Sequence, residues 1–176
     1  LQLNSISNDE ISEEIYYQVI KQKTAALFEA CAGIGAMSTH ASAIEIEEAK
    51  RFGQNLGIIF QIRDDIFDYY DSKEIGKPTG NDMREGKLTL PALYVLNTFD
   101  DEEMRKLALC IRSLDASDED IARFIEYTKV NGGIEYARQA MVDYSNKALA
   151  LLPQSAGQAV KDALTAYIDY VIERDK

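Results

Sequence analysis

Four polar side chains on one short stretch, residues 57–70, have types and spacing that could do chemistry: Gln61, Asp64, Asp65 and Asp68. If this stretch forms a helix, the four fall within an arc of about 100°. Its apolar side chains lie mostly on the other side, where they can pack into a core; they are Ile59, Ile62, Ile66 and Tyr70. The pattern therefore predicts a helix with one polar face and one buried face.

Three carboxylates on one helix face need nearby cations if that face points inward. Two carboxylates about 5 Å apart repel by roughly 3 kcal/mol at an effective dielectric constant of about 20. Mg²⁺ is usually held by one or two carboxylates, waters and substrate phosphates. Lys77 and Lys87 follow beside glycines, and their ammonium groups suit phosphate charge. From the aspartates alone, an exposed acidic helix face is an equally good interpretation, whereas the spacing excludes an EF-hand.

The composition is that of an ordinary globular chain with a strong negative charge. Its 176 residues are 46% hydrophobic and 28% charged, with a formal net charge of −11. This charge argues against binding to nucleic acid or anionic membranes, and no apolar run is long enough for stable membrane insertion. Cys31 and Cys110 have no metal-ligand spacing, so we expect reduced thiols in a cytoplasmic protein. His40 is the only histidine, which excludes a site built from several.

Apolar residues recur at helical spacing along nearly the whole chain, and alternating β-type runs are missing. We therefore expect an all-α fold, an antiparallel helical bundle, in a single domain over residues 1–176. Helix starts are expected at 7–10, 42–45, 98–101 and 117–120, and Pro91 suits a first helical turn. Glycines and Pro78 predict a long loop over 71–88. The small residues of 25–38 could leave room for a ligand, but close helix packing is the favoured interpretation.

Three pieces of sequence occur in an order and at a spacing that point to a known family. They are Gln61-Ile-Arg-Asp64-Asp65-Ile-Phe-Asp68, then Gly76-Lys77-x-x-Gly80-x-Asp82, then Gly86-Lys87-x-Thr89-Leu90-Pro91. Together they resemble the second aspartate-rich region of the trans-isoprenyl (polyprenyl) diphosphate synthases. Upstream, Lys23-Thr24-Ala25 resembles the Lys-Thr motif of that family. The resemblance implies the isoprenoid synthase type of helical bundle.

The resemblance also implies an activity: a prenyltransferase that condenses an allylic prenyl diphosphate with isopentenyl diphosphate, expected as a homodimer. The resemblance implies that Mg²⁺ is bound by Asp64, Asp65 and Asp68. It implies diphosphate binding by Lys23, Lys77 and Lys87. Thr24 and Gln61 would face the forming carbocation. Asp82 would hold a lysine or the loop backbone. The run 89–91 is more similar to medium- and long-chain synthases, which make quinone side-chain precursors, than to short-chain ones.

One part of the family pattern is missing from the sequence. The family has an earlier helix with a first aspartate-rich motif followed by paired arginines, and residues 1–176 contain nothing like it. The chain also begins with Leu1 rather than methionine. We therefore expect the C-terminal part of a synthase, with one wall of a two-walled site and little or no synthase activity by itself.

Four alternatives stay open at this point. The chain could be a non-catalytic subunit or partner of a heteromeric synthase, or part of a short-chain farnesyl or geranylgeranyl synthase. It could belong to a terpene cyclase, although the two Gly-Lys pairs favour chain elongation over cyclisation. An acidic helical interaction domain is the fourth alternative. The complete set of aspartates and lysines argues against the non-catalytic subunit, because a purely structural subunit has no physical need for it.

Overall fold

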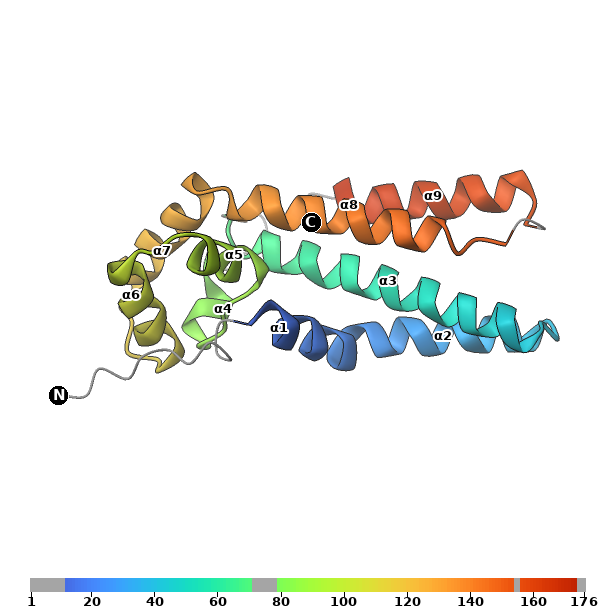
Figure 1. The fold of residues 1–176 in the computed structure, drawn as a ribbon, viewed down its shortest axis with the longest axis horizontal. Helices are drawn as coiled ribbons and strands as arrows, with labels where there is room; N and C mark the ends of the chain where they lie inside the picture. Colours follow the sequence, from blue (N-terminus) through green and yellow to red (C-terminus); the bar gives the residue numbers. More distant parts are fainter. Residues whose placement is uncertain (1–11, 71–78, 154–155, 174–176) are drawn as a thin grey trace. The chain divides into compact units, whose positions relative to one another are not determined.

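The computed structural model describes residues 12–70, 79–153 and 156–173, and all regular structure within them is helical (Figure 1). The all-α prediction is thus confirmed for the described residues. The elements are α1 (Glu13–Ile20), the π-helical turn η2 (Lys21–Ala25), α2 (Ala26–Ser38), α3 (Ala43–Phe67), α4 (Asn81–Arg84), α5 (Leu90–Thr98), α6 (Glu102–Arg112), α7 (Asp118–Val130), α8 (Gly133–Leu149) and α9 (Gln158–Glu173).

The chain divides into two compact units. Unit 1 consists of Leu1–Tyr16 and Asp65–Ala137, and unit 2 consists of Tyr17–Asp64 and Arg138–Lys176. The helices α1, α3 and α8 each run from one unit into the other without a break. The division is therefore not one between consecutive stretches of chain, and the single domain expected over 1–176 stays a prediction.

Unit 2 is built from long helices, and its α2 and α3 pack closely because small residues meet there. A Cβ atom at Gly53 would lie 2.4 Å from the backbone oxygen of Phe28, and one at Gly57 would lie 2.6 Å from the Cα atom of Ala25. Side chains at these two positions would force the helices apart. The close packing predicted from the small residues of 25–38 is thus confirmed where Ala25 and Phe28 meet α3.

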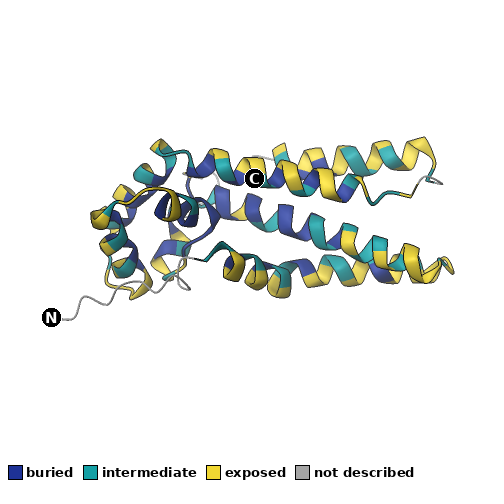
Figure 2. Cartoon of the chain, in the orientation of Figure 1, coloured by how far each residue is buried: buried dark blue, intermediate teal, exposed yellow. Residues whose placement is uncertain are grey.

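Unit 1 contains the short helices α4 to α7 and the most completely buried element of the described chain. Helix α5 buries six of its nine residues, among them Leu90 and Pro91, and Pro91 stands in its first turn as predicted. Figure 2 shows the buried positions of α5 in dark blue. At the start of α8, a Cβ atom at Gly133 would lie 2.6 Å from the backbone oxygen of Pro91. The Gly133 position therefore lets α8 begin against α5.

Two of the predicted helix starts are confirmed as reciprocal caps. Ser42 and Glu45 exchange hydrogen bonds before α3, and Ser117 and Asp120 form a full capping box on α7. At 98–101 the cap is Asp101, whose side chain accepts the N–H groups of residues 103 and 104. The predicted start at 7–10 lies outside the described residues. Within them, no helix is both long and apolar enough to cross a bilayer.

The segment around 67–88 differs from the sequence-based expectation in two ways. Helix α3 ends at Phe67, so the apolar face predicted to include Tyr70 stops one turn earlier. Tyr70 is 45% exposed, whereas Tyr69 is buried. The predicted loop over 71–88 contains α4, one helical turn that begins after Gly80 in the left-handed conformation, with φ of 78°. A glycine adopts this φ readily, which lets the chain turn into α4.

Candidate functional site

The contact between Thr24 and Gln61 joins two predicted site residues that are 37 positions apart in sequence. The Thr24 hydroxyl donates a hydrogen bond to Oε1 of Gln61, with 2.7 Å between the oxygens. Thr24 belongs to η2 and Gln61 to α3, and both lie in unit 2. The side chain of Lys23, next to Thr24, is exposed. The close packing at Gly57, one turn before Gln61, brings the two elements near enough for this bond.

The π-helical turn η2 is a feature that the helical periodicity did not predict. The N–H group of Ala26 reaches the carbonyl oxygen of Lys21, five residues earlier, instead of the usual four. Such single π turns in α-helices are rare and occur frequently at functional sites. Here the turn holds the Lys-Thr pair itself. Only the motif of residues 23–25 marks this place in the sequence, and it does not reveal the π geometry.

The two adjacent aspartates of α3 have different surroundings. Asp64 is exposed, whereas Asp65 is buried, with 4% of its surface accessible. Successive residues on a helix point about 100° apart, which accounts for the difference. The Asp65 carboxylate accepts a hydrogen bond from the hydroxyl of Tyr16 at 2.6 Å, within unit 1. Tyr16 was not among the predicted site residues, because a single tyrosine on an apolar helix face gives no signal in the sequence.

Asp68 follows α3 directly and organises the chain around α4. Its two carboxylate oxygens accept the N–H groups of Asn81 and Asp82, at 2.8 and 2.9 Å. Its backbone oxygen accepts the N–H group of Gly80 at 2.8 Å. Burial raises the pKa of the Asp68 carboxyl above its ordinary value, although the N–H group of Asp82 acts in the opposite direction. Asp68 therefore caps α4 from a distant part of the sequence, in addition to any role toward a cation.

Lys87 lies at the other end of the α4 segment and pairs with acidic side chains. Its ammonium group is 3.8 Å from Oδ1 of Asp82 and also donates a hydrogen bond to Glu85. The N–H group of Lys87 donates to the backbone oxygen of Asp82 at 2.8 Å. The bond to Glu85 raises the pKa of Lys87 above its ordinary value. The prediction that Asp82 holds a lysine is confirmed, whereas Lys77 lies outside the described residues.

A buried phenol adjoins the acidic groups of unit 1. The Tyr69 hydroxyl lies next to Thr89, yet no hydrogen bond of acceptable geometry reaches it within the described part of the chain. Burial raises the pKa of Tyr69 far above its ordinary value, and the negative charges of Asp65, Asp68 and Asp82 add to the rise. Tyr69 therefore stays neutral, an uncharged group close to three carboxylates.

The described residues contain no group of three or more acidic, histidine or cysteine side chains arranged to hold a metal ion. Their chemistry nevertheless fits Mg²⁺, since this ion needs only one or two protein carboxylates when substrate phosphates and waters complete its shell. Asp64 offers an exposed carboxylate and Asp68 a half-buried one. Arg63 on the same helix is buried and donates a hydrogen bond to the backbone oxygen of Glu173.

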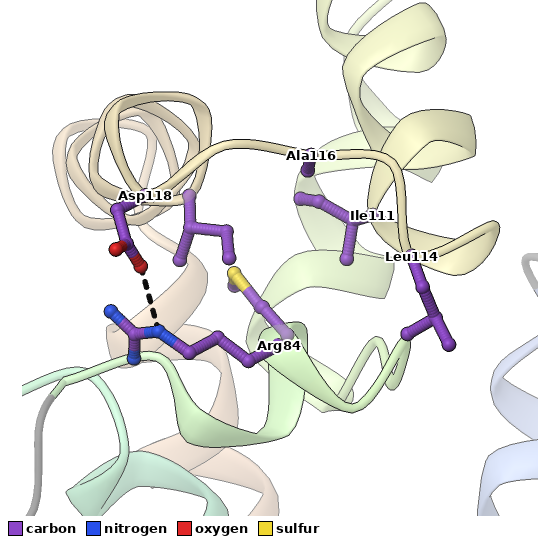
Figure 3. Close-up of a pocket in the computed structure, with 7 residues that line it drawn as sticks. Arg84, Ile111, Leu114, Ala116 and Asp118 are labelled. Atoms are coloured by element: carbon purple, nitrogen blue, oxygen red, sulfur yellow. Dashed lines mark hydrogen bonds and ion pairs between the residues drawn. The ribbon is translucent and has the colours of Figure 1, made fainter.

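A separate hollow of about 230 Å³ lies between α4, α6 and α7 in unit 1 (Figure 3). Its lining combines apolar side chains with two charged ones and consists of Met83, Arg84, Ile111, Leu114, Ala116, Asp118 and Ile121. At one edge, Nε of Arg84 pairs with Asp118 at 2.8 Å, as Figure 3 shows. Among the predicted site residues that the structure describes, none lines this hollow. The Arg84–Asp118 pair instead links α4 to α7.

A family comparison supplies independent information about these residues. Residues 1–128 match the family model described as polyprenyl synthetase. The chain is 30% identical over 177 residues to the octaprenyl diphosphate synthase of Escherichia coli (strain K12), a match that covers 100% of this chain and 54% of the relative. The chain thus spans about half the length of the curated relatives that it matches.

Solved structures are similar over almost the whole chain. The geranylgeranyl pyrophosphate synthase from Bacteroides thetaiotaomicron is 50% identical with a TM-score of 0.89, over 98% of this chain and 57% of that one. The polyprenyl synthase from Caulobacter crescentus CB15, solved with calcium and isoprenyl diphosphate, is 30% identical with a TM-score of 0.84, over 94% and 51%. The expected isoprenoid synthase type of helical fold is confirmed by these likenesses.

Proposed function

Because the chain belongs to the polyprenyl synthetase family, we propose that it forms part of a trans-prenyltransferase that condenses an allylic prenyl diphosphate with isopentenyl diphosphate. One observation carries the proposal: η2 brings the Lys-Thr motif against α3, where Thr24 bonds to Gln61 at 2.7 Å. Gln61 is one turn before the first aspartate of the set. Two motifs that are far apart in sequence thus meet in the structure.

We propose that the aspartates Asp64, Asp65 and Asp68 would hold Mg²⁺, and that bound Mg²⁺ would supply positive charge for a leaving diphosphate. Such preorganised charge is the kind of stabilisation that ionisation of a carbon–oxygen bond requires. The Caulobacter crescentus relative, solved in complex with calcium and isoprenyl diphosphate, supports a divalent cation together with a diphosphate. The carboxylate oxygens of this chain suit Mg²⁺ as well as Ca²⁺.

The lysines and the Thr24–Gln61 pair have different proposed roles. Lys23, Lys77 and Lys87 would bind diphosphate oxygens, and Asp82 would keep Lys87 in reach, as its 3.8 Å ion pair suggests. Thr24 and Gln61 would direct their oxygens toward the allylic cation. The released diphosphate would take the proton that the condensation product loses.

Two further proposals concern the length of the product and the activity of residues 1–176 by themselves. The run 89–91 favours a medium or long all-trans chain for quinone side chains, as does the likeness to an octaprenyl synthase, whereas the likeness to a geranylgeranyl synthase favours a short one. Residues 1–176 contain no first aspartate-rich motif and span about half of their relatives. We therefore expect them to bind diphosphate with Mg²⁺ while turning over little substrate by themselves.

A homodimer is proposed from the exposed apolar face of α2. Leu27, Ile34 and Met37 are 67%, 64% and 54% exposed, and their spacing puts them on one side of the helix. Exposed apolar patches of this kind mark interaction surfaces. Sedimentation of the chain, with Leu27→Glu as the variant expected to shift it to monomer, tests the dimer.

Cys31 and Cys110 are exposed free thiols, which favours the reducing cytoplasm as the compartment.

Calorimetric titration with inorganic pyrophosphate, in Mg²⁺ and then in EDTA, tests the proposed function. We expect affinity that depends on Mg²⁺ and that falls at least about tenfold in Asp64→Ala, the loss of one charged ligand interaction. Asp118→Ala is the matched control, because Asp118 is an exposed aspartate that lines the separate hollow. Unchanged affinity in Asp64→Ala, or an equal loss in both variants, would count against the proposal.

A further inference from the structure

The hydrogen bond from Tyr16 to Asp65 stands out among the contacts of the aspartates. The two oxygens are 2.6 Å apart, the residues are 49 positions apart in sequence, and both side chains are buried, at 9% and 4% exposed. An O–H···O⁻ bond of this length belongs to the short, charge-assisted class. Asp64, one residue earlier, is exposed. Among the proposed metal-binding residues, Asp65 is thus the one whose carboxylate is removed from water.

A buried carboxylate needs hydrogen-bond donors, because an ionised group without them is costly to bury. The Tyr16 hydroxyl supplies one donor to Oδ2 of Asp65 and thereby also limits rotation of the carboxylate about its Cβ–Cγ bond. A tyrosine ring has only two rotatable bonds, so its hydroxyl has a well-defined position once the ring is packed. The donor therefore fixes where the oxygens of Asp65 point.

A second phenol–carboxylate pair on α1 provides a comparison. The hydroxyl of Tyr136 donates to Oε2 of Glu13 at 2.8 Å, also within unit 1. Tyr136 in turn stacks on Tyr94, with 4.2 Å between the ring centroids. Both hydrogen bonds anchor α1 to the rest of unit 1, but the carboxylate of the Tyr136 pair belongs to Glu13 and is not one of the α3 aspartates. A comparison of the two pairs therefore distinguishes a tyrosine that only anchors α1 from one that also orients the Asp65 carboxylate.

We propose that Tyr16 is a positioning residue: its hydroxyl holds the Asp65 carboxylate in the orientation in which that carboxylate receives Mg²⁺ together with a diphosphate. This inference rests on the function proposed above. Hydrogen-bond partners of metal ligands fix ligand orientation, and their removal typically costs 10–100-fold in metal affinity. Tyr16 acts through Asp65 and is not itself a catalytic residue.

The test compares Tyr16→Phe with Tyr136→Phe by calorimetric titration of inorganic pyrophosphate over a range of Mg²⁺ concentrations. For Tyr16→Phe we expect the Mg²⁺ concentration at half-maximal binding to rise about tenfold or more. Saturating Mg²⁺ should restore the wild-type pyrophosphate affinity, because the lysines are untouched. For Tyr136→Phe we expect a change below about twofold, since its partner Glu13 lies outside the aspartate set. Thermal unfolding of both variants reports any general loss of packing.

The outcomes separate this inference from the proposed function. If the wild-type chain binds pyrophosphate with Mg²⁺ and loses this binding in Asp64→Ala, but Tyr16→Phe behaves like wild type, only the role of Tyr16 is overturned. Equal losses of Mg²⁺-dependent binding in Tyr16→Phe and Tyr136→Phe would mean that both tyrosines only anchor α1. That result would also overturn the role proposed for Tyr16. If the wild-type chain shows no Mg²⁺-dependent binding, the proposed function and the role of Tyr16 both fail.

Discussion

The predicted site residues of unit 2 and those of unit 1 are held in place by different physical means. In unit 2, Thr24 meets Gln61 because glycines allow α2 and α3 to approach within contact of each other's backbone. In unit 1, Asp68 and Lys87 are held by hydrogen bonds and ion pairs around α4. The first part depends on steric fit, whereas the second depends on charge and on backbone N–H groups. Substitutions should therefore affect the two parts differently.

The largest loss of stability is expected from Gly57→Ala, which disturbs the close packing of α3 in unit 2. The new Cβ atom would lie 2.6 Å from the Cα atom of Ala25, so backbone must move. Overpacking of this kind costs about 1–3 kcal/mol, and we expect the upper half of that range. Gly35→Ala is the matched control on α2, because nothing lies within 4 Å of its added Cβ atom. The control should stabilise by about 0.5–1 kcal/mol, and urea unfolding measures both.

Asp68→Ala is expected to have the next largest effect, because it attacks the charge-based part. The N–H groups of Asn81 and Asp82 would lose their acceptors, at a cost of about 1–2 kcal/mol. The control is Asp118→Ala, which removes the exposed α7 partner of Arg84, a residue of α4. This change should cost under about 1 kcal/mol. A larger loss for Asp118→Ala than for Asp68→Ala in urea unfolding would show that Asp68 does not organise α4.

Thr24→Val should lower stability by about 1 kcal/mol, since it removes one partly buried hydroxyl and keeps the side-chain shape. Thr165→Val on α9 provides a control, because that hydroxyl donates a hydrogen bond to the carbonyl oxygen of Lys161 on its own helix. It should change stability by less than about 0.5 kcal/mol. Chemical unfolding of both variants decides whether the bond across α3 and η2 contributes more than a local one.

Lys87→Gln should have the smallest effect on stability, below about 0.5 kcal/mol, because the lysine side chain is 49% exposed and its ion pairs are screened. The affinity for pyrophosphate in Mg²⁺ should nevertheless fall about tenfold, as expected for loss of one charged hydrogen bond. Lys106→Gln makes the same charge change at an exposed position of α6. An equal loss of affinity in the control would assign the effect to net charge instead of to the site.

The sequence could predict the features that depend on periodicity and short motifs. Ile59, Ile62 and Ile66 are buried as the helical pattern requires, and the Ser42 and Ser117 caps form as their local spacing dictates. These features depend on residues within one or two turns of each other. Local pattern is therefore sufficient to derive them.

The remaining features depend on contacts between distant residues, which periodicity does not encode. The end of α3 at Phe67 puts Tyr69 inside and Tyr70 outside, and it frees Asp68 to cap α4. The hydroxyl of Tyr16 reaches Asp65 only because the fold brings α1 to this part of α3. The π turn at Lys23 and Thr24 likewise leaves the apolar pattern unchanged. A motif identified the right residues, but their surroundings required the structure.

The central claim is that the α3 aspartates bind Mg²⁺ together with a diphosphate. A crystal structure of the chain grown with Mg²⁺ and inorganic pyrophosphate tests it most directly. The account predicts Mg²⁺ at about 2.1 Å from carboxylate oxygens of Asp64, Asp65 or Asp68, with pyrophosphate oxygens completing its shell. Pyrophosphate and Mg²⁺ bound away from these aspartates, for example in the hollow beside Arg84, would contradict it.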